Sequence, residues 1–336
     1  MRVYVGYDSA RSFWRAAGSE DALMREGRRA ASLTRCATTA MQFRAAPLAQ
    51  AGIGEPPYHV IIFDQNKRCI KEGYRFHVCT RRLPAGSFIC IGKEIYLSCP
   101  ELSFLQMART LSLPQLVEYG TELCAVYSFD ENGTVCPRER PLTSRNKLEK
   151  FLDDSQGAPN STVARKALRW VSDLSVSPLQ TRLMSLLCLK PHYGGYSIPL
   201  PDEGTLLNVS GGEHGSGTGP LALTWAEQRV ELTIYNKASG WTPSIRPDGS
   251  IEGTRRLIGA PDSKRRRLRV IELDLSELAA ADRFDVRARA LGRALKRTMH
   301  PRNPKQLKNV AALRAMLDIE SYEEAMRSFS SLPMNE

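Results

Sequence analysis

Four short apolar segments between residues 58 and 99 constrain the fold most strongly. They read YHVIIFD, GYRFHVC, SFICI and EIYLSC. Each is rich in Ile, Val, Tyr or Phe and is bounded by turn residues, a composition typical of β-strands. Pro100 then begins a segment with the apolar spacing of a helix, and residues 121–130 (TELCAVYSFD) read as a further strand. Alternating strand and helix signals predict an α/β (α+β) fold.

A second set of signals begins near residue 177. Ser177 and Pro178 are a cap and a first helical residue for SPLQTRLMSLLCL. LALTWAEQRVELTIY, from Leu221 to Tyr235, predicts a hairpin of two strands, and RRRLRVIELDLSEL predicts another strand near 270–275. We therefore expect a helical and small-sheet domain at 1–172, a mixed sheet flanked by helices at 173–300, and a helical tail at 301–336.

Composition excludes several classes of protein. No run of 18 apolar residues occurs, and the first residues lack the pattern of a secretory signal, so we expect a cytoplasmic protein that does not span a membrane. The eight cysteines show no C-x-x-C pair and no zinc-finger spacing, which predicts free thiols. G-x-S-x-G is also absent, so a Ser–His–Asp hydrolase is unsupported.

The positive charge is concentrated in the C-terminal third. The net charge is +11, and residues 251–310 contain 16 Lys/Arg against 7 Asp/Glu. Such a segment attracts polyanions, of which nucleic acid is the commonest in a cytoplasm, although a solvated basic face would have the same composition.

Several short sequence segments resemble those of a known family. SCPELSFLQMA, RPLTS, ARKALRWVSD and GGYSIPLP are similar to a family of uncharacterised bacterial proteins. That family joins a region like abortive-infection antitoxins to a domain like very-short-patch-repair endonucleases, of the PD-(D/E)XK superfold. The resemblance implies a restriction-endonuclease-like sheet, DNA as partner, Mg²⁺ as cofactor of an active member, and a role in regulation, toxin–antitoxin pairing or defence.

The catalytic positions of that family are altered in this chain. Gln180 stands where the family has Glu, Ala222 where it has Asp, and Thr233 and Tyr235 lie where the second strand ends in acidic residues. In such enzymes carboxylates hold Mg²⁺, and the bound metal activates water. The side chains at these four positions have no carboxylate and cannot hold the metal in this way. We therefore expect no catalytic residues, no metal and no small-molecule cofactor.

Other acids offer a weaker route to a metal site. Glu213, His214 and Glu231 could form a rebuilt site, but their spacing does not support one, and we expect Glu231 to be a surface strand residue. Trp241, in a polar loop, is a candidate contact for a nucleic-acid base.

The sequence thus predicts a DNA-binding protein with a degenerate nuclease-like domain. The residues expected to contact phosphate are Arg265, Arg266, Arg267, Arg289, Arg293 and Arg297. Two alternatives remain open: an active Mg²⁺-dependent endonuclease with a rearranged site, and a protein-interaction module that binds an acidic protein.

Overall fold

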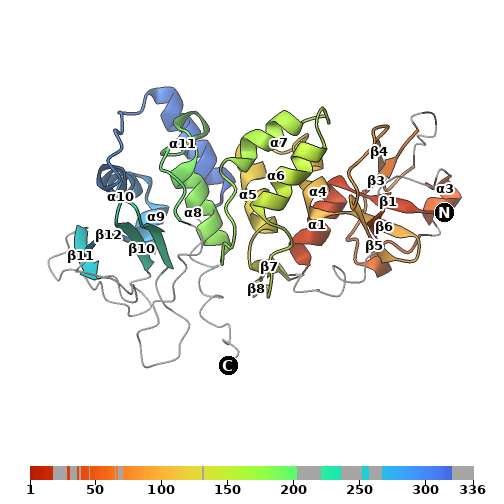
Figure 1. Cartoon of the computed structure of the whole chain (residues 1–336), viewed down its shortest axis with the longest axis horizontal. Coiled ribbons are helices and arrows are strands. Elements are labelled where there is room, and N and C mark those ends of the chain that lie inside the picture. The colour runs from red at the N-terminus through yellow and green to blue at the C-terminus, as the bar shows by residue number, and fades with distance from the viewer. Residues whose placement is uncertain are drawn as a thin grey trace. The chain divides into compact units, whose positions relative to one another are not determined.

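The computed structural model shows two compact units, Met1–Ser177 and Pro178–Glu336 (Figure 1). It describes residues 1–17, 29–30, 36–37, 39–44, 46–64, 66, 71–130, 132–202, 221–235, 252–256 and 267–319. The sequence placed the boundary at 172/173, a few residues before the one that separates the units. It also predicts a helical tail at 301–336, of which residues 301–319 are described and fall within the second unit.

The described part of the first unit is built on a six-stranded mixed sheet with the order β2-β5-β6-β1-β3-β4. The strands are β1 (Val3–Val5), β2 (Arg29–Ala30), β3 (Tyr58–Ile62), β4 (Tyr74–Val78), β5 (Phe88–Gly92) and β6 (Ile95–Ser98). The four apolar segments from 58 to 99 are therefore confirmed as strands. β1, which the sequence did not predict, lies inside the sheet, antiparallel to β3 and parallel to β6.

Helices of the first unit pack on this sheet and on one another. Among the described residues they are α1 (Tyr7–Ala16), α3 (Ala40–Arg44), α4 (Pro100–Met107), α5 (Leu113–Leu123), α6 (Arg145–Asp154) and α7 (Ser161–Leu168), with a small hairpin of β7 (Tyr127–Phe129) and β8 (Val135–Pro137). α1 packs against α4 and β3. Local sequence explains where two helices begin: the Ser144 hydroxyl accepts a hydrogen bond from the Lys147 amide, and Ser112 with Gln115 forms a capping box.

A buried arginine joins two helix ends in the first unit. Arg138 donates hydrogen bonds to the carbonyls of Trp14 and Ala17, at the end of α1, and to those of Glu122 and Ala125, at the end of α5. The last carbonyls of a helix have no donor in the next helical turn, so the guanidinium supplies donors where the two helices end; the Glu122 oxygen also accepts from the Ala125 amide at 3.3 Å. Burial lowers the pKa of Arg138 to about 10, which leaves it charged at neutral pH.

The described part of the second unit contains a four-stranded sheet with the order β11-β12-β10-β9. Its elements are α8 (Pro178–Cys188), β9 (Leu221–Trp225), β10 (Val230–Tyr235), β11 (Glu252–Arg256), β12 (Arg267–Asp274), α9 (Leu275–Ala279), α10 (Ala281–Ala294) and α11 (Pro304–Met316). The predicted hairpin is confirmed as the antiparallel pair β9–β10. β12 runs parallel to β10, and β11 pairs with its other edge.

The two faces of this sheet differ in chemistry. Leu223, Leu232 and Ile271 share one face, which is apolar and buried. The pleat turns the alternate residues to the other face, where Thr233 and Glu272 are polar and also buried. A polar face that is excluded from water requires internal hydrogen bonds, and this face carries Ala222, Thr233 and Tyr235, three of the four positions that the resemblance marks as altered.

The α+β class is thus confirmed, with mixed sheets flanked by helices. None of the described helices is long and apolar enough to cross a membrane. The seven cysteines in the described part of the chain are all free thiols, four of them buried.

Candidate nucleic-acid interface

Three strands bring two of the altered catalytic positions together. Ala222 pairs with Thr233 across β9 and β10, and Thr233 pairs with Glu272 across β10 and β12. All three side chains are buried and form one row on the polar face of the sheet. Ala222 and Thr233, the two strand positions at which the resemblance predicts metal ligands, are therefore neighbours, and neither carries a carboxylate.

Tyr235 and Gln180 occupy different surroundings. Tyr235 pairs with Asp274, two residues along the strands from the pair Thr233–Glu272. The pKa of Tyr235 is raised chiefly by burial and, to a smaller extent, by the charges of Asp274, Glu272 and Glu277. The tyrosine thus lies among carboxylates. Gln180 is buried within α8.

Sequence reasoning misjudged the carboxylates of this face. Glu231 is only 4% exposed and accepts a hydrogen bond from the Thr233 hydroxyl at 2.8 Å, so its prediction as a surface residue is wrong. Glu272 and Asp274, which the sequence analysis did not single out, are 5% and 9% exposed. The sequence VIELD did contain a signal for these acids, because Glu272 and Asp274 alternate with apolar residues as in a strand with two different faces. That they lie on the same face as Glu231 follows only from the register of β10 against β12.

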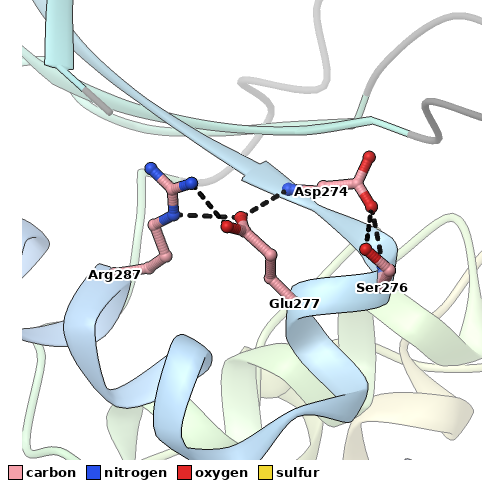
Figure 2. A network of polar contacts seen from close by, with 4 residues as sticks. All are labelled: Asp274, Ser276, Glu277 and Arg287. Carbon is pink, nitrogen blue, oxygen red and sulfur yellow. Dashed lines mark hydrogen bonds and ion pairs between the residues drawn. The ribbon is translucent and has the colours of Figure 1, made fainter. Parts of the chain in front are cut away.

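Two of the acidic residues near this face, Asp274 and Glu277, have a structural role, which Figure 2 shows. Asp274 caps α9 by accepting hydrogen bonds from the Ser276 amide at 2.9 Å and from its hydroxyl at 2.5 Å. Glu277 completes the capping box by accepting from the Asp274 amide, and it forms a two-bond ion pair with Arg287 at 2.6 and 2.9 Å. These contacts fix the end of β12 and join α9 to α10.

The donor set does not fit a magnesium site of the nuclease type. Gln180, Ala222, Thr233 and Tyr235 supply no carboxylate, whereas such enzymes bind the metal through one or two of them. Across the described ranges, no group of three His, Cys, Asp or Glu side chains is placed to hold a metal ion. Glu213, His214 and Trp241 lie outside the described residues.

The six predicted phosphate contacts are not equivalent. Arg265 and Arg266 lie outside the described residues, and Arg267 begins β12 with a side chain that is not described. Arg289 donates to Asp285 at 2.5 Å within α10, so its charge is already neutralised. Arg293 and Arg297 are exposed, as a phosphate contact requires.

A segment free of acidic residues surrounds these two arginines. Residues 286–317 contain nine Lys/Arg and no Asp/Glu. Four of the nine are bound internally: Arg287 to Glu277, Arg289 to Asp285, and Arg302 and Arg314 to backbone carbonyls. The other five are exposed and form no ion pair with any described residue; they are Arg293, Lys296, Arg297, Lys305 and Lys308. We call these five the basic segment; it covers the end of α10 and the start of α11.

A separate group of titratable side chains lies in the first unit. The ring nitrogens of His59 and His77 are 3.1 Å apart, and the His59 ring lies 3.6 Å from the Asp8 carboxylate. The Tyr7 ring stacks on His77 with centroids 3.6 Å apart. Burial is the main cause that lowers the pKa of His59, which favours the neutral ring. The sequence analysis did not pair the two histidines, because their strands pair only in the folded sheet.

Comparisons of the chain with protein-family models, with curated proteins and with solved structures give no match.

Proposed function

We propose that the chain binds duplex DNA through the basic segment and does not cleave it. The observation that carries the proposal is the exposure of Arg293, Lys296, Arg297, Lys305 and Lys308 within 32 residues that contain no acid. Cations that lack an internal counter-ion are available to phosphates, and release of the DNA's own counter-ions then drives binding. Location in the cytoplasm and a role in regulation or defence belong to the same proposal; the first is supported by the sequence composition and the second by the family resemblance.

The salt dependence of binding tests this proposal directly. Fluorescence anisotropy of a labelled duplex would be measured with the full chain over a range of salt concentrations. The logarithm of the affinity should fall linearly with the logarithm of the salt concentration, with a slope of about 0.9 per phosphate contact. An affinity that does not change with salt would refute the proposal.

A matched pair of triple variants locates the interface. Changing Arg293, Lys296 and Arg297 to Gln should reduce the slope by up to about 2.7, the value for three phosphate contacts. Changing Lys150, Lys166 and Arg169 to Gln removes the same charge from exposed positions of the first unit and should leave the slope unchanged. Equal effects of the two triples would mean that net charge, rather than the basic segment, governs binding.

Cleavage by a rearranged site is the competing function, since Glu231 and Glu272 are buried carboxylates on one sheet face. Supercoiled plasmid would be incubated with Mg²⁺ or Mn²⁺, with and without chelator. We expect no nicking. Chelator-sensitive nicking that Glu231→Gln or Glu272→Gln abolishes would establish the endonuclease instead. The remaining alternative is a protein-interaction module that binds an acidic protein. Heparin and an acidic protein, tested as competitors of DNA binding, distinguish this alternative.

A further inference from the structure

A short segment before the sheet of the second unit contacts both α10 and α11, the helices whose facing ends carry the basic segment. It runs from Lys190 to Tyr196 and contains consecutive glycines. Gly194 has a φ of +97°, and a Cβ there would lie 2.3 Å from the Asn309 carbonyl oxygen on α11. The Asn309 side chain donates to the His192 carbonyl at 3.0 Å. α11 therefore lies directly on this backbone, at a distance that only glycine permits.

Arg302 fixes the start of α11 to the same segment. Its guanidinium lies 3.8 Å from the centre of the Tyr196 ring, and it donates to the Gly195 carbonyl at 3.0 Å. Arg302 directly precedes Asn303, whose side chain caps α11. A guanidinium stacked on a ring and bonded to a carbonyl is held in one orientation, which a lysine cannot reproduce.

Tyr196 carries this connection on to α10. The side chain is buried, and its hydroxyl donates to Asp285 at 3.0 Å. The other oxygen of Asp285 accepts from Arg289 at 2.5 Å. Burial is the main cause that raises the pKa of Tyr196 well above its ordinary value, so the hydroxyl stays protonated and remains a donor. A continuous set of contacts thus joins Arg302, Tyr196 and Asp285 across the two helices.

We propose that Tyr196 and Arg302 are positioning residues of the DNA interface, which hold the α10 half and the α11 half of the basic segment at a fixed spacing. This inference rests on the proposed function. A duplex presents its phosphates at regular intervals, so cations held in register contact several at once without the entropy cost of ordering them. Arg302 is cationic and lies between the two halves, yet its guanidinium is engaged with Tyr196 and Gly195, so it acts through its neighbours.

Substitutions that conserve charge separate positioning from direct contact. Arg302→Lys keeps the charge but loses the flat stacking, and Tyr196→Phe keeps the ring but loses the bond to Asp285. If the spacing of the two halves is lost, about one phosphate contact is lost, which lowers duplex affinity about eightfold at 0.1 M salt and reduces the salt slope by about 0.9. We expect Arg302→Lys to show this full effect and Tyr196→Phe a smaller one in the same direction. Arg169→Lys, which conserves charge at an exposed position of the first unit, outside the basic segment, should bind like the wild type.

The outcomes distinguish this inference from the function on which it rests. A merely structural role would lower the melting temperature without changing the slope measured on folded protein. If the wild type binds with salt dependence and both Arg302→Lys and Tyr196→Phe keep its slope and affinity, the positioning role is refuted and the proposed function stands. If Arg302→Lys does not fold, Tyr196→Phe decides alone. If the wild type does not bind duplex DNA, the proposed function fails and this inference with it.

Discussion

Replacement of Arg138 by methionine should destabilise the first unit by several kcal/mol. Arg138 bridges two helix ends, because it donates to the carbonyls of Trp14 and Ala17 on one side and of Glu122 and Ala125 on the other, at 3.1 to 3.3 Å. Methionine has a similar length and fills the space, but it donates no hydrogen bond. The substitution therefore removes four bonds while largely preserving packing.

The magnitude follows from the four hydrogen bonds. Hydrogen bonds from a charged donor contribute about 1.5 kcal/mol each at the lower end, net of the bonds to water that they replace, hence at most about 6 kcal/mol for four. The Glu122 oxygen keeps a donor in the variant, because it also accepts from the Ala125 amide. We therefore expect Arg138→Met to reduce the free energy of unfolding by about 3 to 6 kcal/mol.

Hydrogen exchange measures this loss within one unit of a two-unit chain. Exchange of peptides from α1 and α5 under native conditions gives the free energy of opening of that region. Arg82→Met is the matched control, because Arg82 is exposed in the same unit and its loss should cost less than about 0.5 kcal/mol. A loss below about 1 kcal/mol for Arg138→Met, or one equal to the control, would show that the four bonds do not hold the helix ends together.

Two further predictions concern ionisable side chains. Because the folded-state pKa of His59 lies below its ordinary 6.5, chiefly through burial and against the opposing effect of Asp8, the unfolded chain takes up a proton first on acidification. The contribution of His59 to the stability of the first unit should be fully present above pH 6.5 and should be lost as the pH drops through the folded-state pKa. His59→Asn should make the stability, measured by hydrogen exchange of β3 amides, less dependent on pH in this range. A steeper fall in the variant would contradict this assignment. Asp274→Ala should destabilise α9 by about 1 kcal/mol through loss of the cap to Ser276, and Asp274→Asn should restore it. Failure of Asn to restore the stability, measured by exchange of α9 amides with and without Mg²⁺, would indicate that the carboxylate charge has another task.

Local pattern was sufficient to predict the elements whose partners are adjacent in sequence. The β9–β10 hairpin follows from the alternation on each side of a short polar turn, and α6 begins at Ser144, a residue type typical of helix caps. Residues 121–130 were predicted as a strand, yet residues 121–123 belong to α5, which starts at the Ser112 capping box and extends to Leu123. An apolar run of that length is ambiguous between helix and strand, and the cap upstream decides it.

The site depended on pairings that no local pattern contains. Glu231 and Glu272 share a face only because β12 runs parallel to β10, a register between segments far apart in the chain. Carboxylates are rarely buried, so an exposed Glu231 was the natural expectation. The ion pair of Arg289 with Asp285, by contrast, has a sequence signal, since the acid lies four residues before the base on one helix.

The interior position of β1 has a consequence for the order in which the first unit forms. β1 is synthesised before β3 and β6, the two strands that flank it, and its pairing with β6 joins Val3 to Ile95. During synthesis, therefore, β1 can pair with β3 once residues near 62 have left the ribosome, but its edge that faces β6 has no partner until residues near 98 have followed. Sheets closed by such distant pairings form slowly, because the loop between the partners must close before any bond stabilises it. β1 is thus secured on both sides only late, and its edge that faces β6 stays open to other chains throughout that interval.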